Sequence, residues 1–327
     1  MFNALLGSIP SPDINSFDLG PVTIHFYAVL ILIGIVLATF LTAKRLQTRG
    51  VKQGFVIDIV IWAVPFGIIG GRIFHVLTHI NDYFGAGADW MGVFRIWEGG
   101  LAIYGALIFG VLGAYLGCRQ VGVRFFTFAD ALVPGLLIAQ AVGRFGNYFN
   151  KELFGTPTDL PWGLEIPSTN PSYPAGLPTG ELFHPTFLYE ALWSILGVAV
   201  LLFIERKINP QWGELFAGYL IWYSVGRFMI EQIRLDPANV YFGQRSNAWM
   251  AVLGVLVGLG ILVRQRRAHH GLLTSPYLPG REPAVEVPAA AEPESDTGSE
   301  SAAGHSSAAA AEANEAVALE SEKPETN

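Results

Sequence analysis

Seven runs of apolar residues follow one another along the chain, and each is long enough for a helix that crosses a lipid bilayer. The hydrocarbon core of a bilayer is about 30 Å thick and requires about 20 residues of helix. The first run is the most uniform, because residues 22–43 include no Asp, Glu, Lys or Arg. We therefore predict an all-α integral membrane protein with seven transmembrane helices, at residues 22–42, 55–77, 100–117, 125–142, 186–204, 214–230 and 248–263.

The positions of Lys and Arg predict the orientation of these spans, since basic residues concentrate in cytoplasmic loops. They follow the first, third, fifth and seventh runs, whereas the opposite loops are poorer in them and residues 1–21 have none. This alternation places the N-terminus outside the cell and the C-terminus in the cytoplasm, with an external segment at residues 143–185. The basic residues on the predicted cytoplasmic side are Lys44, Arg45, Arg49, Lys52, Arg119, Arg124, Arg206, Lys207, Arg264, Arg266 and Arg267.

Composition separates a membrane region from an acidic tail. Charged residues make up 14% of the 327 residues, well below the roughly 25% of soluble domains. The net charge of −7 is unevenly distributed, since residues 268–327 have −9 and residues 1–267 have +2. The tail is rich in Ala, Glu, Ser and Pro, and such a segment buries too little apolar area to fold. We predict a membrane domain at residues 1–267 and a disordered cytoplasmic tail at residues 268–327.

The sequence also argues against several classes of site. One cysteine, Cys118, is insufficient for an intrachain disulfide or for a zinc site built from cysteines. No strongly basic domain favours binding of nucleic acid, and the polar residues form no set suited to a metal; we expect no cofactor. Asp13 and Asp18 precede the first apolar run, where a cleavable signal peptide would have positive charge.

Charged residues within membrane segments are costly and therefore mark candidate sites. At the outer end of the sixth run, Tyr223, Arg227, Glu231 and Arg234 are spaced four, four and three residues apart, so that a helix would place them on one face. One interpretation is a salt-bridged helix end whose long side chains reach the membrane surface. The other is an anion site facing the bundle interior, because two planar guanidinium groups suit a phosphate.

A second polar cluster occupies residues 143–155, where the fourth run ends on the outer side. Its polar side chains alternate with aromatic residues, and its three glycines permit close backbone approach. Together with the first cluster it predicts one external site, for which an anionic lipid headgroup in the outer leaflet is the natural ligand. The polar residues of this outer half are Tyr27, Arg72, Glu98, Arg144, Asn147, Asn150, Glu152, Glu190, Arg227, Glu231 and Arg234.

The sequence of residues 143–155, GRFGNYFNKELFG, resembles the signature of the prolipoprotein diacylglyceryl transferase family. Supporting similarities are WEGG at residues 97–100, HPT at 184–186 with LYE at 188–190, and Arg227-Phe228 followed by Glu231 and Arg234. The order and spacing agree over roughly residues 18–264. The resemblance therefore covers the predicted membrane domain and leaves the tail outside.

This resemblance implies a seven-span enzyme of the bacterial inner membrane whose active site faces outward. Such an enzyme transfers the diacylglyceryl group of phosphatidylglycerol to the thiol of a lipobox cysteine in a secreted preprolipoprotein. A thioether forms and glycerol phosphate is released, which is the first step of bacterial lipoprotein maturation. The thiol belongs to the substrate, in agreement with a chain whose one cysteine, Cys118, lies near the predicted cytoplasmic side.

Residue roles carry over by the same resemblance. Arg144 and Arg227 are expected to contact the phosphate and to stabilise charge on the leaving glycerol phosphate. Tyr27 matches the tyrosine of the family's first span, and we expect it to be catalytic as well. Glu231 and Arg234 match the pair that orders the sixth-span site. The other residues expected to bind substrate are Asn147, Asn150, Glu152, Gly155, Glu98, Gly99, Tyr104 and Arg72.

The third span departs from the family pattern. Many members carry His-Gly-Gly there, with the histidine assigned as a base, whereas the aligned run here is Tyr104-Gly105-Ala106. A tyrosine with a pKa near 10 is a poor base at neutral pH. Either another group removes the thiol proton or no dedicated base is needed, because a thiol of pKa about 8.5 already supplies some thiolate. Tyr104 is therefore expected to line the site.

Two other classes of protein share parts of this pattern. A lipid or anion transporter also places charges inside a bundle, but it typically shows repeat symmetry or paired broken helices near mid-membrane, and neither is evident in the sequence. A seven-span receptor or scaffold explains the topology but gives no reason for three arginines near one face. The transferase hypothesis accounts for both features.

Overall fold

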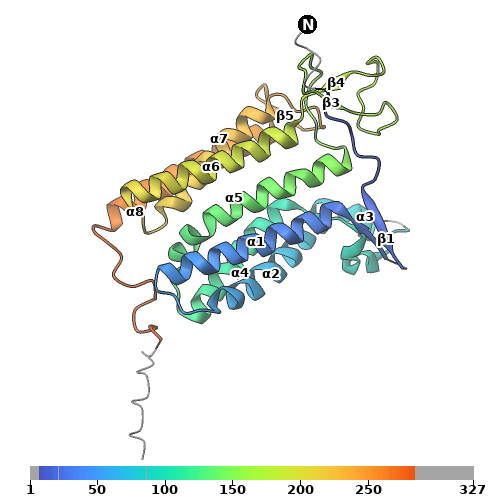
Figure 1. Ribbon diagram of the computed structural model, residues 1–327. Coiled ribbons are helices and arrows are strands. Elements are labelled where there is room, and N and C mark those ends of the chain that lie inside the picture. The colour runs from blue at the N-terminus through green and yellow to red at the C-terminus, as the bar shows by residue number, and fades with distance from the viewer. Residues whose placement is uncertain (1–6, 21, 86, 284–327) are drawn as a thin grey trace, which may run out of the picture. The chain divides into compact units, whose positions relative to one another are not determined.

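Long helices dominate the computed structural model, which describes residues 7–20, 22–85 and 87–283 (Figure 1). Seven helices in this part of the chain have 18 to 26 residues. They coincide with the seven predicted apolar runs, although most extend a few residues further. They are α1 (Phe26–Thr48), α2 (Phe55–Thr78), α4 (Ile103–Val121), α5 (Phe125–Asn150), α6 (Thr186–Ile208), α7 (Glu214–Glu231) and α8 (Ser246–Ala268).

The surface of this bundle is apolar. Among the described residues, five helices are long and apolar enough to cross a membrane: α1, α2, α5, α6 and α8. In α1, Leu32 and Val36 are 62% and 66% exposed, whereas Gly34 and Ala38 are buried. Large apolar side chains outside and small residues inside are typical of helices that pack in lipid. The fold is that of a mostly helical, multi-pass membrane protein.

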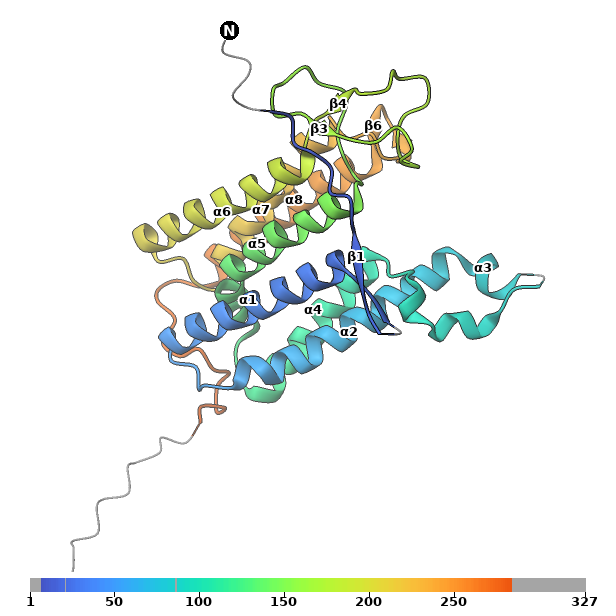
Figure 2. The ribbon, with the colours of Figure 1, turned by 45° about the vertical axis from the view of Figure 1, so that its right-hand side comes forward.

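Small residues allow the helices to approach closely. α1 packs along α5, where a Cβ built on Gly135 would lie 2.9 Å from the Ala38 backbone. α2 packs along α4, where a Cβ on Gly113 would lie 2.5 Å from the Trp62 carbonyl oxygen. A side chain at either position would force the helices apart. In Figures 1 and 2, α1, α2 and α4 lie on one side of α5, and α6, α7 and α8 on the other.

The contact between α6 and α7 is made by a reciprocal pair of tryptophans. The rings of Trp193 and Trp222 stack with centroids 4.4 Å apart. Each indole N–H donates to the backbone carbonyl of the other residue, at 3.0 and 3.1 Å. Gly226 makes room for the Trp193 ring, since a Cβ there would overlap it. This packing fixes the position of Arg227, the next residue.

One end of the bundle carries all the short elements (Figure 2). Three antiparallel strand pairs lie there: β1 (Ser16–Leu19) with β2 (Val22–His25), β3 (Leu164–Glu165) with β4 (Leu182–Phe183), and β5 (Val240–Tyr241) with β6 (Gln244–Arg245). α3 (Ile80–Phe84), η1 (Trp90–Phe94) and η2 (Ile96–Glu98) follow α2 at this end. A cluster around Phe154, Leu164 and Phe183 forms a small core of its own. This is the end predicted to be external.

Two boundaries differ from the sequence-based prediction. The external segment was predicted from residue 143, but α5 continues to Asn150 and ends where Lys151 adopts φ 53°. Gly143 and Gly146 do not interrupt the helix, and Tyr27 of α1 packs against Gly146. The ordered chain also passes residue 267: Tyr277 is 5% exposed, and its hydroxyl accepts from the Lys52 N–H at 2.7 Å. The rest of the predicted tail, residues 284–327, lies outside the described residues.

Candidate functional site

The signature arginine lies in a buried ion pair between helices. Arg144 of α5 places its Nη2 atom 2.5 Å from Oε2 of Glu190 on α6. The other carboxylate oxygen of Glu190 lies 3.6 Å from Nη1 of Arg234, which follows α7. The side chains of Glu190 and Arg234 are 9% and 4% exposed. Since buried charges are stable only when paired, Glu190 holds both guanidinium groups in place.

A second ion pair lies at the end of α7. Nη2 of Arg227 is 2.8 Å from Oε2 of Glu231, whose side chain is fully buried. The other carboxylate oxygen of Glu231 accepts from Nε of Arg245 at 2.7 Å and from the Asn247 amide at 3.1 Å. The i, i+4 spacing brings Arg227 and Glu231 together within the helix, whereas Arg245 and Asn247 reach Glu231 from the start of α8.

Asp236 joins the two pairs into one network. Its carboxylate lies 2.6 Å from Nε of Arg234 and 3.3 Å from Nη2 of Arg245. Four arginines and three carboxylates therefore form a continuous chain with a net charge of +1. We call it the arginine network; its members are Arg144, Glu190, Arg234, Asp236, Arg245, Glu231 and Arg227.

Arg227 retains one free donor within this network. Its Nη1 atom is buried and has no hydrogen-bond partner among the described residues. A buried N–H group without a partner costs about 1–3 kcal/mol, so that such groups are rare in native proteins. An anionic ligand would satisfy this donor and balance the net positive charge. The arginine network is therefore suited to a phosphate.

The signature supplies a second polar group beside Arg144. The side-chain amides of Asn147 and Asn150 donate to the same oxygen of Glu152, at 2.9 and 3.2 Å. Both asparagines lie in the last turn of α5, and Lys151 turns the chain so that Glu152 points back toward them. The two amides orient the Glu152 carboxylate without neutralising it.

Gly155 connects the signature to the arginine network through the backbone. Its N–H donates to the His184 carbonyl at 2.9 Å, and the next N–H, of Thr156, donates to the Ile233 carbonyl at 2.7 Å. A Cβ on Gly155 would lie 2.8 Å from the His184 side chain and 3.0 Å from the Ile233 oxygen. A glycine is required because the chain passes between these two segments, next to Arg234.

Two aromatic residues border the site. The Tyr27 ring packs directly on Gly146 of α5, where a Cβ would overlap it, and Tyr27 remains 38% exposed. The Tyr104 hydroxyl lies 3.4 Å from Oδ1 of Asn247. Because Asn247 in turn donates to Glu231, Tyr104 of α4 reaches the arginine network through one side chain.

The structure does not bring Arg72, Glu98 and Gly99 into contact with the arginine network. The Arg72 guanidinium donates to five backbone carbonyls, those of Gly92, Val93, Arg95, Gly99 and Gly100. Glu98 pairs with Arg95 at 3.3 Å, and its side chain is 53% exposed. In this arrangement Arg72 holds the short helices after α2 against the bundle.

Sequence reasoning did not identify Arg245, Asp236 or Asn247. One signal was present for Arg245: it is a basic residue at the outer end of the last apolar run, where the predicted external loops are otherwise poor in Lys and Arg. Asp236 and Asn247 are short polar residues in the flanking loop, and only the fold places them beside Arg234 and Glu231.

Comparisons with known proteins identify the family. The model of the family described as prolipoprotein diacylglyceryl transferase matches residues 15–264. Relatives named phosphatidylglycerol–prolipoprotein diacylglyceryl transferase include proteins from Leifsonia xyli, 51% identical over 86% of this chain and 89% of the relative, and from Paenarthrobacter aurescens, 48% identical over 78% and 82%. The Streptomyces griseus relative is 44% identical over 90% and 86%. This chain belongs to the prolipoprotein diacylglyceryl transferase family.

Proposed function

We propose that this protein transfers the diacylglyceryl group of phosphatidylglycerol to the lipobox cysteine of a secreted preprolipoprotein. A sulfur–carbon bond forms as the bond between the glyceryl carbon and the phosphate oxygen breaks. The thiol loses its proton, and glycerol phosphate leaves with the electron pair. The names of the relatives support this reaction. The structural observation that supports the arginine network as the site is the buried Nη1 donor of Arg227, which has no partner in a network of net charge +1.

The arginines act on the leaving group. Negative charge builds on the phosphate as its bond to the glyceryl carbon breaks, and fixed donors in a water-poor site stabilise such charge strongly. Arg227 offers its free Nη1, and Arg144 lies on α5 two residues before Gly146, on which the Tyr27 ring packs. Glu190 and Glu231 are positioning residues, because each holds two guanidinium groups in fixed orientation.

The attacking thiol comes from the substrate. A free thiol of pKa about 8.5 has a few per cent thiolate at neutral pH, and nearby guanidinium groups increase this fraction. Tyr104 lines the site through Asn247, and the reaction does not require it as a base. The chain's own Cys118 is buried at the opposite end of the bundle.

We also propose that α4 and α7 cross the membrane with the five most apolar helices. They have 19 and 18 residues and pack along α2 and α8, respectively. Seven spans, with the N-terminus outside and the C-terminus in the cytoplasm, place the arginine network at the outer surface of the bacterial cytoplasmic membrane. The basic loops then lie in the cytoplasm, as expected from the distribution of Lys and Arg.

The test is transfer by the purified protein in detergent, from phosphatidylglycerol to a lipobox-cysteine peptide, followed by peptide mass. We expect a gain of one diacylglyceryl group, and no gain with a Cys→Ser peptide. Arg144→Ala and Arg227→Ala should each abolish transfer in protein that still inserts, whereas Arg264→Gln, at the opposite end of α8, should retain it. Near wild-type turnover in the Arg227 variant would exclude the proposed role.

A further inference from the structure

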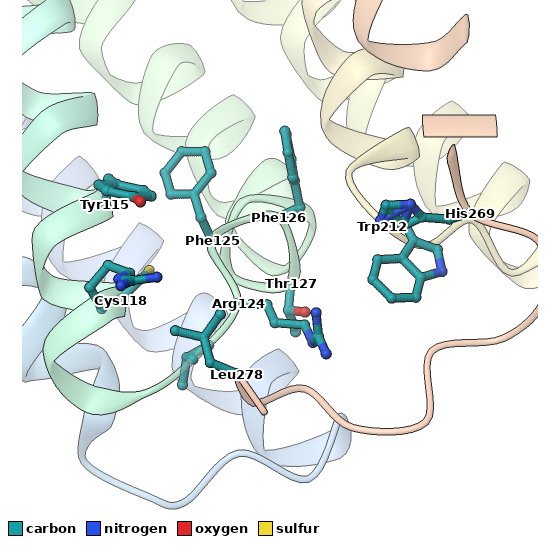
Figure 3. Close-up of a pocket in the computed structure, with 11 residues that line it drawn as sticks. Tyr115, Cys118, Arg124, Phe125, Phe126, Thr127, Trp212, His269 and Leu278 are labelled. Carbon is teal, nitrogen blue, oxygen red and sulfur yellow. The ribbon is translucent and has the colours of Figure 1, made fainter. Parts of the chain in front are cut away.

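A cavity lies at the end of the bundle opposite the arginine network. Its volume is about 280 Å³, and it lies between the end of α4, the start of α5, the loop before α7 and the end of α8 (Figure 3). Aromatic side chains, those of Tyr115, Phe125 and Phe126, form much of its wall, and Trp212 and His269 stand together on another side. The transfer reaction proposed above makes no use of this cavity.

Two arginines in the lining have donors that no described protein group satisfies. Arg119 is exposed and has no hydrogen bond or ion pair with any described residue. Arg124 donates from Nε to the Ser275 carbonyl at 3.2 Å and lies over the Trp212 ring at 5.3 Å. Within residues 7–283, its two Nη atoms have no partner. The lining contains no Asp or Glu to neutralise either guanidinium.

Two further groups make the cavity attractive to an anion. Nδ1 of His269 is buried and has no hydrogen-bond partner among the described residues, while its ring packs edge-on against Trp212. α5 also begins here, at Phe125, with no side chain capping its first amides. The first N–H groups of a helix lack intrahelical partners and favour negative charge. Guanidinium groups, an imidazole and the start of a helix thus line the same cavity.

The position of the cavity indicates the kind of anion. Tyr115 is 44% exposed, and the residues one turn earlier in α4, Val111 and Leu112, are 51% and 44% exposed and apolar. The cavity therefore lies where an apolar helix surface meets basic loops, which is the level of lipid headgroups. Its aromatic wall suits the glycerol backbone and the first acyl carbons, which a free phosphate lacks.

We propose that this cavity binds the phosphate headgroup of an anionic phospholipid from the cytoplasmic leaflet. Arg119, Arg124 and the start of α5 would hold the phosphate, and the aromatic wall would hold the glycerol. The site is separate from the one that binds the lipid substrate, and the leaflet assignment rests on the proposed topology.

The experiment places a photoreactive residue in the cavity of the full-length protein. Two variants carry p-benzoylphenylalanine, one in place of Phe126 and one in place of Leu278 on the other side of the cavity. Each is illuminated in detergent with phosphatidylglycerol or with phosphatidylcholine. The adduct is then identified by mass. We expect adducts with phosphatidylglycerol and few with phosphatidylcholine. Arg119→Gln should reduce the yield about tenfold, as expected for one lost charge-assisted hydrogen bond. The matched control, Arg267→Gln, is exposed at the end of α8 and should not change it.

Three results would overturn the proposal. Equal capture of the two lipids would show that charge is not recognised, and failure of either position to capture phosphatidylglycerol while inorganic phosphate still binds at the cavity would identify a free-phosphate site. Adducts with residues 284–327 of the chain itself would show that the acidic tail, not a lipid, is the occupant. Because the readout is capture and not turnover, its outcome is independent of whether the protein transfers diacylglyceryl groups.

Discussion

At the scale of single residues, two glycines of α5 give a sharp test of Tyr27. A Cβ on Gly146 would overlap the Tyr27 ring, whereas a Cβ on Gly143 meets nothing within 4 Å. Both changes to alanine favour the helix by about 1 kcal/mol, so the fold should persist in each. We expect Gly146→Ala to displace Tyr27 and lower the transfer rate at least about tenfold, a loss of about 1.4 kcal/mol in transition-state stabilisation. Gly143→Ala should have the transfer rate of the wild type. Equal transfer rates for the two variants would show that Tyr27 has no part in the reaction.

A second test at this scale concerns Glu190. Its carboxylate holds Arg144 and Arg234; Glu190→Gln leaves the largely buried Arg144 guanidinium without a counterion and Arg234 with Asp236 alone. Breaking a buried pair typically costs about 3–5 kcal/mol. We expect a lower melting temperature in detergent and little transfer. Asp159→Asn removes an exposed carboxylate on the same side of the bundle and serves as the control. An unchanged melting temperature for Glu190→Gln would mean that the pair does not hold the helices together.

At the scale of helices, contact between α2 and α4 depends on which glycine faces the partner. A Cβ on Gly113 would lie 2.5 Å from the Trp62 carbonyl oxygen and 2.8 Å from Phe66, whereas on Gly110 the nearest atom is 3.8 Å away. Overpacking of this kind costs about 1–3 kcal/mol. Gly113→Ala should therefore lower the melting temperature, while Gly110→Ala, three residues away, should leave it unchanged or raised. If the two variants have the same melting temperature, the helices adjust freely to the added methyl group and the contact is not tight.

The same scale shows what the sequence could predict. Apolar runs located all seven long helices, because burial in lipid requires uninterrupted apolar segments. The end of α5 was misplaced, since the polar residues of 143–150 point into the protein and keep the helix intact. The spacing placed Arg227 and Glu231 on one face of a helix, and the structure pairs them. A buried carboxylate at Glu190 leads one to expect an arginine partner, but only the fold shows that the partners are Arg144 and Arg234. The roles of Arg245 and Asp236 depend on loop geometry and are revealed by the fold alone.

At the scale of the whole molecule, the orientation of the bundle in the membrane decides which side the site faces. α1 and α5 are antiparallel, because Tyr27 at the start of α1 packs on Gly146 and Ala38 further along packs on Gly135. Residue 172, which follows α5, therefore lies on the same side of the membrane as the start of α1. If the N-terminus is outside, residue 172 is external and Gln47, near the end of α1, is cytoplasmic; in the reverse orientation the two exchange sides.

Single cysteines distinguish the two arrangements. In a Cys118→Ser background, Ser172→Cys and Gln47→Cys each place one thiol on an exposed residue. With a membrane-impermeant maleimide applied to intact spheroplasts, an external N-terminus predicts labelling of Ser172→Cys alone, and labelling of Gln47→Cys only after permeabilisation. Labelling of Gln47→Cys alone would support the reverse orientation and would put the arginine network on the cytoplasmic side, where a secreted preprolipoprotein does not present its cysteine. External labelling of residue 172 is therefore required by the proposed reaction as well as by the proposed topology.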